Sequence, residues 1–85
     1  MDKVIIDVRE PEEYAGGHVE GAINIPLSKL MGDLPGLSNV SKDTEIILYC
    51  RTGSRSSVAM HILRTKGYTN PINGINQGQV KARYL

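Results

Sequence analysis

Two short apolar runs constrain the fold of this chain more than any other feature. They are VIIDV at residues 4–8 and EIILYC at residues 45–50, both rich in branched aliphatic side chains. Runs of this kind are typical of strands that are buried on both faces of a sheet. Because segments with helical features follow each run, the order of elements favours an α/β fold. We expect a small parallel β-sheet flanked by helices on both faces.

The longest helical segment covers residues 54–66 and ends naturally at Gly67. Its apolar residues recur at helical spacing and predict one buried face, formed by Val58, Ala59, Ile62 and Leu63. A shorter helix begins at Pro11, which suits the first helical position, and ends at residues 16–17, a pair of glycines. The other expected elements are a short strand within residues 21–27, a helix over 28–34 with Ser28 as its cap, a loop over 34–44, a strand over 68–72, and a loop with a terminal helix over 73–85.

Length and charge exclude several classes of protein. The chain has 85 residues, which predicts one domain, residues 1–85, with one modest core. The formal net charge is +1, so the sequence has no electrostatic footprint for nucleic acid or for an anionic membrane. No apolar run approaches the roughly 20 residues that span a bilayer. We therefore expect neither a nucleic-acid partner nor a membrane partner.

The thiol content bears on compartment and on metal binding. Cys50 is the only cysteine, so no disulfide can form within the chain. A free thiol fits a reducing compartment, so we expect the cytoplasm, or the periplasm if the chain is a mature form whose signal peptide was removed. His18 and His61 lie far apart and show no metal-ligand spacing with Cys50. We therefore expect no metal site.

The position of Cys50 indicates a reactive thiol. It ends a predicted buried strand and directly precedes the longest helix, and ligands of open α/β sheets bind at that edge. The N–H groups of residues 51–54 can converge on one point, where Gly53 permits the required backbone angles. The helix dipole and the charges of Arg51 and Arg55 also favour a thiolate. We expect the pKa of Cys50 to lie below the usual value of about 8.5. The alternative is a buried, inert structural cysteine.

Other polar residues near this edge allow two interpretations each. Asp7 and Arg9 flank the end of the first strand. Asp7 can pair with an arginine of the Cys50 loop and hold its shape, or it can form a local ion pair without bearing on activity. His18 can contact the site, but a hydrogen-bonded scaffold role is favoured. We expect most of the glutamates of residues 9–14 to be a solvated helix start, and Ser56 to cap or open the long helix rather than act as a nucleophile.

Three segments resemble one known family. CRTGSR resembles the Cys-x-x-Gly-x-Arg active-site loop of the rhodanese family of sulfurtransferases. IIDVREPEEYAGGHVEGAINIPL resembles the amino-terminal signature of the family, and SSVAMHILRTKGYTNPIN resembles the helix and strand that follow the catalytic loop. The resemblance runs from about Val4 to Asn76, with the pieces in the family's order. It implies a rhodanese-like fold, similar to that of small bacterial thiosulfate sulfurtransferases, some cytoplasmic and some exported.

The resemblance also implies a mechanism. Cys50 would take the outer sulfur of thiosulfate, or of a polysulfide or persulfide donor, and pass it from a persulfide to cyanide or to a thiol. The loop residues that would cradle the sulfur or an anionic substrate are Arg51, Thr52, Gly53, Ser54 and Arg55. The supporting residues would be Asp7, Arg9, His18 and Ser56. No metal or organic cofactor is implied, and we expect a monomer or a weak dimer.

Two alternatives and one departure from the family pattern stay open. Cysteine phosphatases place five residues between cysteine and arginine, whereas only residues 51–54 separate Cys50 from Arg55, which disfavours a phosphate site. A regulatory or carrier-binding module without turnover is the second alternative, although such modules often lack the cysteine. Many family members carry a Gly-Gly-[Ile/Leu]-x-x-Trp segment near the end. This chain has Asn-Gly-Ile at residues 73–75 and no tryptophan, so the sequence does not predict how its last dozen residues dock.

Overall fold

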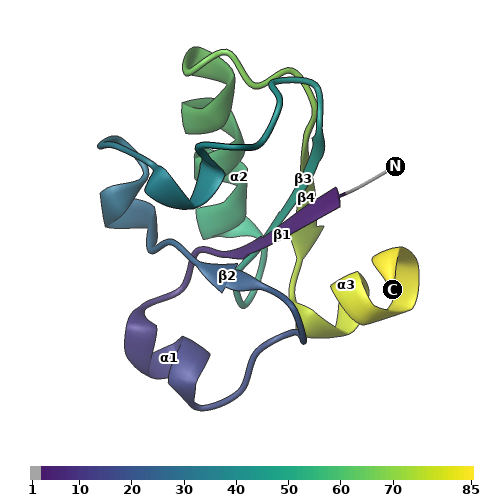
Figure 1. Ribbon diagram of the computed structural model, residues 1–85. Helices are drawn as coiled ribbons and strands as arrows, with labels where there is room; N and C mark the ends of the chain where they lie inside the picture. The colour runs from purple at the N-terminus through teal and green to yellow at the C-terminus, as the bar shows by residue number, and fades with distance from the viewer. Residues whose placement is uncertain (1–2) are drawn as a thin grey trace.

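The computed structural model describes residues 3–85, apart from the side chain of residue 35. Four strands form one sheet: β1 Lys3–Asp7, β2 Ile23–Asn24, β3 Glu45–Tyr49 and β4 Pro71–Ile75. Their order is β2-β1-β3-β4, and every neighbouring pair is parallel (Figure 1). The expected α/β fold with a parallel sheet is therefore confirmed.

The helices are α1 Pro11–Ala15, α2 Ser54–Thr65 and α3 Gln77–Tyr84, with two 3₁₀ turns at Leu27–Lys29 and Pro35–Leu37. Figure 1 shows α2 and α3 on opposite sides of β3 and β4, with α1 beyond the end of β2. No helix within residues 3–85 is long and apolar enough to cross a membrane.

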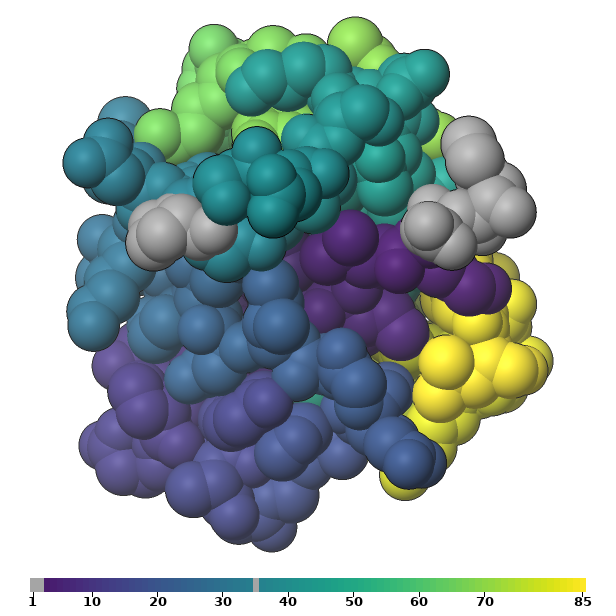
Figure 2. All heavy atoms as spheres, in the orientation of Figure 1, coloured from purple at the N-terminus to yellow at the C-terminus, as the bar shows by residue number. Residues whose placement is uncertain are grey.

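Side chains of β3 alternate between the two faces of the sheet and divide the core. Ile46 and Leu48 point toward α2, where they pack with Leu63 in one apolar cluster. Ile47 points the other way and packs with Val80 of α3 in a second cluster. Figure 2 shows a surface where β1 is bordered by the C-terminal residues on one side and by residues near 25–30 on the other. Because both faces are covered, the strands need no polar side, which explains the continuous apolar runs.

The prediction of a helix over residues 28–34 is wrong. The chain forms a 3₁₀ turn at Leu27–Lys29, with Pro26 rather than Ser28 at the capping position. Glycine at position 32 and proline at position 35 disfavour a continuous helix. The two 3₁₀ turns instead place in the core Leu30, which is completely buried, and Leu37, which is only 2% exposed. Isolated turns are sufficient to place these two side chains in the core.

The prediction of which residues form the buried face of α2 is partly wrong. Ala59 and Leu63 are fully buried as expected, but Val58 is 50% exposed. The third fully buried position on the helix is Ser56, whose hydroxyl is hydrogen-bonded. A polar residue thus takes a core position because partners satisfy it, and the apolar pattern alone could not indicate this.

The strand expected over residues 68–72 lies at Pro71–Ile75 instead. Gly74 and the polar Asn73 have low β-propensity, so the sequence did not predict that the strand includes them. Pairing with β3 nevertheless makes these residues part of the sheet. A Cβ at Gly74 would lie 2.7 Å from Val80 Cγ2 and 2.8 Å from Ile47 Cγ2. The absence of a side chain at Gly74 therefore lets α3 pack closely on the sheet, which is how the last residues dock.

Candidate active site

Cys50 lies directly beyond the carboxyl end of β3, in the connection to α2. Its N–H donates to the carbonyl of Ile75 at 3.1 Å, so the backbone still follows β4. The residue is only 2% exposed. This is the sheet edge at which the sequence placed the thiol, and the neighbouring strand holds it in position.

The loop after Cys50 wraps around the sulfur. Gly53 caps α2 with φ of 95°, a conformation that strongly favours glycine, as expected. Its N–H donates to Cys50 Sγ at 3.1 Å, and the Ser56 hydroxyl lies 3.5 Å from the same sulfur. The loop therefore surrounds the thiol with hydrogen-bonding groups that suit a negative sulfur.

These contacts change the acidity of the thiol. Burial of Cys50 acts to raise its pKa, because it disfavours the charged form. The Ser56 hydroxyl and the N–H groups of Ser56, Thr52 and Gly53 act in the opposite direction, and together they lower the pKa of Cys50 to about 7. The lowered pKa raises the fraction of thiolate at neutral pH, and the thiolate is the nucleophilic form of cysteine.

An open pocket of about 380 Å³ exposes the site to solvent. It is lined by Arg9, Cys50, Arg51, Asn76, Gln77 and Gly78. Arg51 is exposed, so its charge is available to a solute. The amino end of α3 borders the same pocket as the Cys50 loop. Two arginines and the positive end of a helix therefore favour an anion in this pocket.

Arg55 does not point at the sulfur. Its Nη1 donates to Glu13 Oε1 at 2.8 Å and its Nη2 donates to Glu13 Oε2 at 3.2 Å, which joins α2 to α1. The hydrogen bonds from Arg55 lower the pKa of Glu13 to about 2, and the pair raises the pKa of Arg55. Glu13 is therefore an exception to the expectation that most glutamates of residues 9–14 form a solvated helix start. Its acidic, helix-starting context gave no signal of a partner 42 residues away.

Asp7 does not pair with an arginine of the Cys50 loop, contrary to the functional expectation. It binds Arg9, whose Nε lies 2.9 and 3.0 Å from the two carboxylate oxygens and whose Nη2 lies 2.6 Å from Oδ2. The pair forms because both side chains are buried beside each other at the end of β1. The bond to Asp7 raises the pKa of Arg9 despite the opposing effect of burial.

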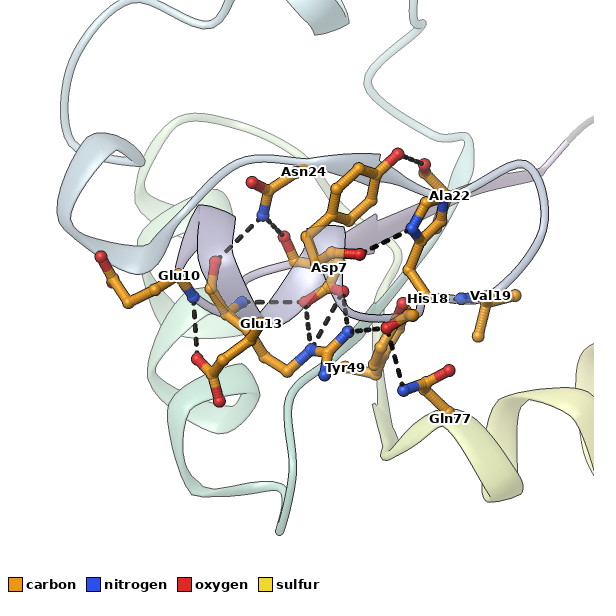
Figure 3. A network of polar contacts seen from close by, with 12 residues as sticks. Asp7, Glu10, Glu13, His18, Val19, Ala22, Asn24, Tyr49 and Gln77 are labelled. Atoms are coloured by element: carbon orange, nitrogen blue, oxygen red, sulfur yellow. Dashed lines mark hydrogen bonds and ion pairs between the residues drawn. The ribbon is translucent and has the colours of Figure 1, made fainter.

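Asp7 lies in a wider network of polar contacts (Figure 3). Its partner Arg9 lines the pocket. Arg9 Nη2 also donates to the carbonyl of Gly17 at 2.7 Å, and Gln77 of α3 donates to that carbonyl at 3.3 Å. Asn24 donates to the carbonyls of Asp7 and Arg9 at 2.9 and 3.0 Å. Arg9 is thereby fixed in the pocket wall.

His18 lies in the same network but does not line the pocket. Its Nδ1 lies 2.9 Å from the carbonyl of Tyr14, and because a carbonyl can only accept, Nδ1 carries the proton. The ring stacks on the Tyr14 ring with centroids 3.6 Å apart. This geometry agrees with the favoured scaffold interpretation.

Ser54, Thr52 and Ser56 have different surroundings. The hydroxyls of Thr52 and Ser54 lie 3.3 Å apart on the exposed side of the loop. Ser56 is buried and donates to Asn73 Oδ1 at 2.6 Å. The sequence analysis missed Asn73, whose Nδ2 donates to the Gly53 carbonyl at 3.1 Å. In the sequence, the only indication that this position is unusual was that Asn-Gly-Ile departs from the family pattern.

Among residues 3–85, no group of three His, Cys, Asp or Glu side chains is arranged to hold a metal ion.

Comparisons with known proteins show the family to which the chain belongs. Residues 1–80 match the family model of the rhodanese-like domain. The chain therefore belongs to the rhodanese-like family. A solved structure described as rhodanese with anions from E. coli superposes with a TM-score of 0.80 at 37% identity, covering 92% of this chain and 91% of that chain. The human single-domain sulfurtransferase TSTD1 superposes with a TM-score of 0.74 at 27% identity, covering 98% and 84% of the two chains.

Two bacterial relatives are similar in sequence. The thiosulfate sulfurtransferase PspE of Escherichia coli (strain K12) is 43% identical over 68 residues, which are 80% of this chain and 64% of PspE. The uncharacterized protein YqhL of Bacillus subtilis (strain 168) is 40% identical over 84 residues, covering 93% of this chain and 64% of YqhL. The chain thus spans somewhat less than two thirds of the length of each of these relatives.

Proposed function

We propose that this chain is a sulfurtransferase that carries sulfane sulfur as a persulfide on Cys50, with thiosulfate as a donor. The observation that carries the proposal is the Gly53 N–H bond to Cys50 Sγ at 3.1 Å, in a pocket shared with Arg51. The names of PspE and of a sulfurtransferase of Allochromatium vinosum, 32% identical over 72 residues, support this class of reaction.

In the first half-reaction the Cys50 thiolate attacks the outer sulfur of thiosulfate. A new sulfur–sulfur bond forms to Sγ, the original sulfur–sulfur bond breaks, and its electron pair leaves with sulfite. No separate base is needed, because a pKa of about 7 already supplies the thiolate. The product is a Cys50 persulfide.

In the second half-reaction an acceptor removes the outer sulfur. Cyanide or a thiolate attacks that sulfur, and the electron pair of the persulfide bond returns to Cys50 Sγ. The products are thiocyanate, or a persulfide of the acceptor, and the free Cys50 thiolate. The N–H groups of the loop stabilise the negative sulfur on Cys50 at the start and at the end of the cycle.

The charges in the pocket support an anionic donor. Arg51 is exposed beside the thiol and can meet thiosulfate, while Arg9 is held in the wall by Asp7. The N–H groups of Thr52, Gly53 and Ser56 supply the short backbone cradle, and the pair of Arg55 with Glu13 braces it. The cradle is one residue shorter than that of cysteine phosphatases, which favours sulfur over phosphate.

Mass spectrometry after exposure to thiosulfate tests the proposal. We expect the intact protein to gain one sulfur atom, to lose it when cyanide is added, and to release thiocyanate. The matched control is Cys50→Ser, which should stay folded, gain no sulfur and form no thiocyanate. A wild-type protein whose mass is unchanged, or a Cys50→Ser variant with near wild-type activity, would contradict the mechanism.

A further inference from the structure

Asn73 in β4 links the Cys50 loop to the sheet through its side-chain amide. Nδ2 donates to the carbonyl of Gly53 at 3.1 Å, and Oδ1 accepts from the N–H of Ile75 at 3.0 Å. Because a carbonyl can only accept and a backbone N–H can only donate, these two contacts determine which end of the amide is the oxygen. Any further group close to Oδ1 must therefore be a donor.

The Ser56 hydroxyl is that donor. Its oxygen lies 2.6 Å from Asn73 Oδ1, 3.2 Å from the Gly53 carbonyl and 3.5 Å from Cys50 Sγ. A serine hydroxyl has a single proton, so it cannot donate to all three groups at once. While the proton points to Asn73, Ser56 turns a lone pair toward Sγ. This arrangement suits a neutral thiol, whose S–H can donate to Ser56.

The thiolate form of Cys50 requires the opposite orientation. Turning the Ser56 hydroxyl toward Sγ gains a charge-assisted hydrogen bond, but it gives up the short bond to Asn73. Asn73 Oδ1 tolerates this loss because it keeps the N–H of Ile75. One hydroxyl therefore has two competing acceptors, and the amide is one of them.

We propose that Asn73 is a positioning residue for the nucleophile: it competes with the Cys50 thiolate for the Ser56 proton and so limits how far the loop stabilises the thiolate. The inference rests on Cys50 being the nucleophile of the proposed sulfur transfer.

The charged groups around the thiol come from three elements and do not involve Asn73. They are Arg9 and Arg51 in the pocket, Arg55 at the start of α2, whose charge interacts with that of Cys50, and the partners Asp7 and Glu13. None of these side chains is hydrogen-bonded to Asn73 within residues 3–85. They stay unchanged when Asn73 is replaced, apart from a response to any added charge.

Alkylation of the only thiol as a function of pH tests the proposal and needs no sulfur donor. Iodoacetamide rates are measured for wild type, Asn73→Leu and Asn73→Asp, each with and without Ser56→Ala. Leucine has a similar size but removes the competing acceptor, so the apparent pKa of Cys50 should fall by about half a unit to one unit. Aspartate keeps an acceptor and adds a negative charge, so the pKa should rise. In the Ser56→Ala background, Asn73→Leu should leave the pKa unchanged.

A purely structural role for Asn73 gives a different pattern. A loosened loop would raise the pKa in both Asn73 variants, whether or not Ser56 is present. A rise or no change in Asn73→Leu overturns the proposal, and so does a fall that persists without Ser56. If urea unfolding shows that Asn73→Leu is not folded, Asn73→Asp decides. Its pKa rise should be smaller in the Ser56→Ala background, and an equal rise overturns the proposal.

The same experiment separates this inference from the proposed function. If the protein shows the expected alkylation pattern but takes no sulfur from thiosulfate, the competition for the Ser56 proton is supported and the proposed sulfur transfer is contradicted. If the protein forms the persulfide but shows the alkylation pattern of a purely structural role, the sulfur transfer is supported and the competition for the Ser56 proton is contradicted.

Discussion

Arg55 and Glu13 are joined by two parallel hydrogen bonds, 2.8 and 3.2 Å long, that connect the first turn of α2 to α1. Because Arg55 lies between Gly53 and Ser56, which both contact Cys50 Sγ, the pair anchors the loop from outside the pocket. A bidentate pair of this kind also fixes the direction of the guanidinium. Arg55 therefore differs from Arg51, whose exposed side chain borders the pocket.

The Glu13–Arg55 pair predicts a loss of stability in acid. The pKa of Glu13 is lowered to about 2 in the folded chain, against about 4.3 for an unperturbed glutamate. A depressed carboxyl pKa stabilises the fold above the unfolded value, and this contribution is lost as the pH falls from about 4.3 to about 2. Urea unfolding at several pH values should show the decline in wild type and a weaker decline in Glu13→Gln.

The matched control is Glu12→Gln, which changes the neighbouring exposed glutamate and should keep the wild-type acid profile. A profile for Glu13→Gln that matches wild type would show that the pair contributes nothing measurable.

Replacement of the two loop arginines should affect different kinetic constants. Arg51→Ala removes an exposed charge that meets the anionic donor, so the thiosulfate KM should rise about five- to tenfold with little change in kcat. Arg55→Ala should instead lower kcat and the melting temperature, because the cradle loses its anchor. Steady-state kinetics at two salt concentrations and thermal unfolding measure both effects.

Arg64→Ala serves as the charge control for these variants, since Arg64 is exposed in the last turn of α2 and does not line the pocket. The assignment is reversed if Arg55→Ala gives the pure KM effect and Arg51→Ala gives the loss of stability.

The Cys50 thiol should ionise near neutral pH. The loop lowers its pKa to about 7, whereas an unperturbed cysteine has a pKa of about 8.5. The rate of iodoacetamide alkylation should therefore reach half its maximum near pH 7, and the same protein in urea should do so near the usual value. By linkage, the ionised thiol contributes stability above about pH 8.5, and this is lost as the pH falls through about 7. A folded-state midpoint at the unfolded value would show that the cradle does not stabilise the thiolate.

Gly74→Ala should destabilise the fold by about 1–3 kcal/mol, because the new methyl group overpacks the space between the sheet and α3. The added Cβ would lie 2.7 Å from Val80 Cγ2, 2.8 Å from Ile47 Cγ2 and 3.3 Å from the Leu48 carbonyl. Gly32→Ala is the control, since its nearest neighbour would be 3.7 Å away. Chemical denaturation measures both variants, and equal stabilities would show that the sheet and helix shift without cost.

The sequence determined the features that arise within one short segment. The apolar run of residues 45–50 predicted a buried strand, and the glycine at position 53 predicted a sharp turn into a helix. Together they placed Cys50 at the carboxyl edge of a parallel sheet, where β3 and α2 hold it. These features depend on local backbone preference and on burial of apolar surface, which the order of residues records directly.

Only the tertiary structure decided the polar partners around that thiol. Arg55 pairs with Glu13 rather than with Asp7, and the Ser56 hydroxyl meets Asn73, because separate segments of the chain approach each other at the sheet edge. Each partner is separated from the other by many residues, and several other carboxylates and amides in the chain have the same chemistry. Hydrogen bonds act over about 3 Å, so the choice among chemically equal partners depends on the packing of the strands and helices that carry them.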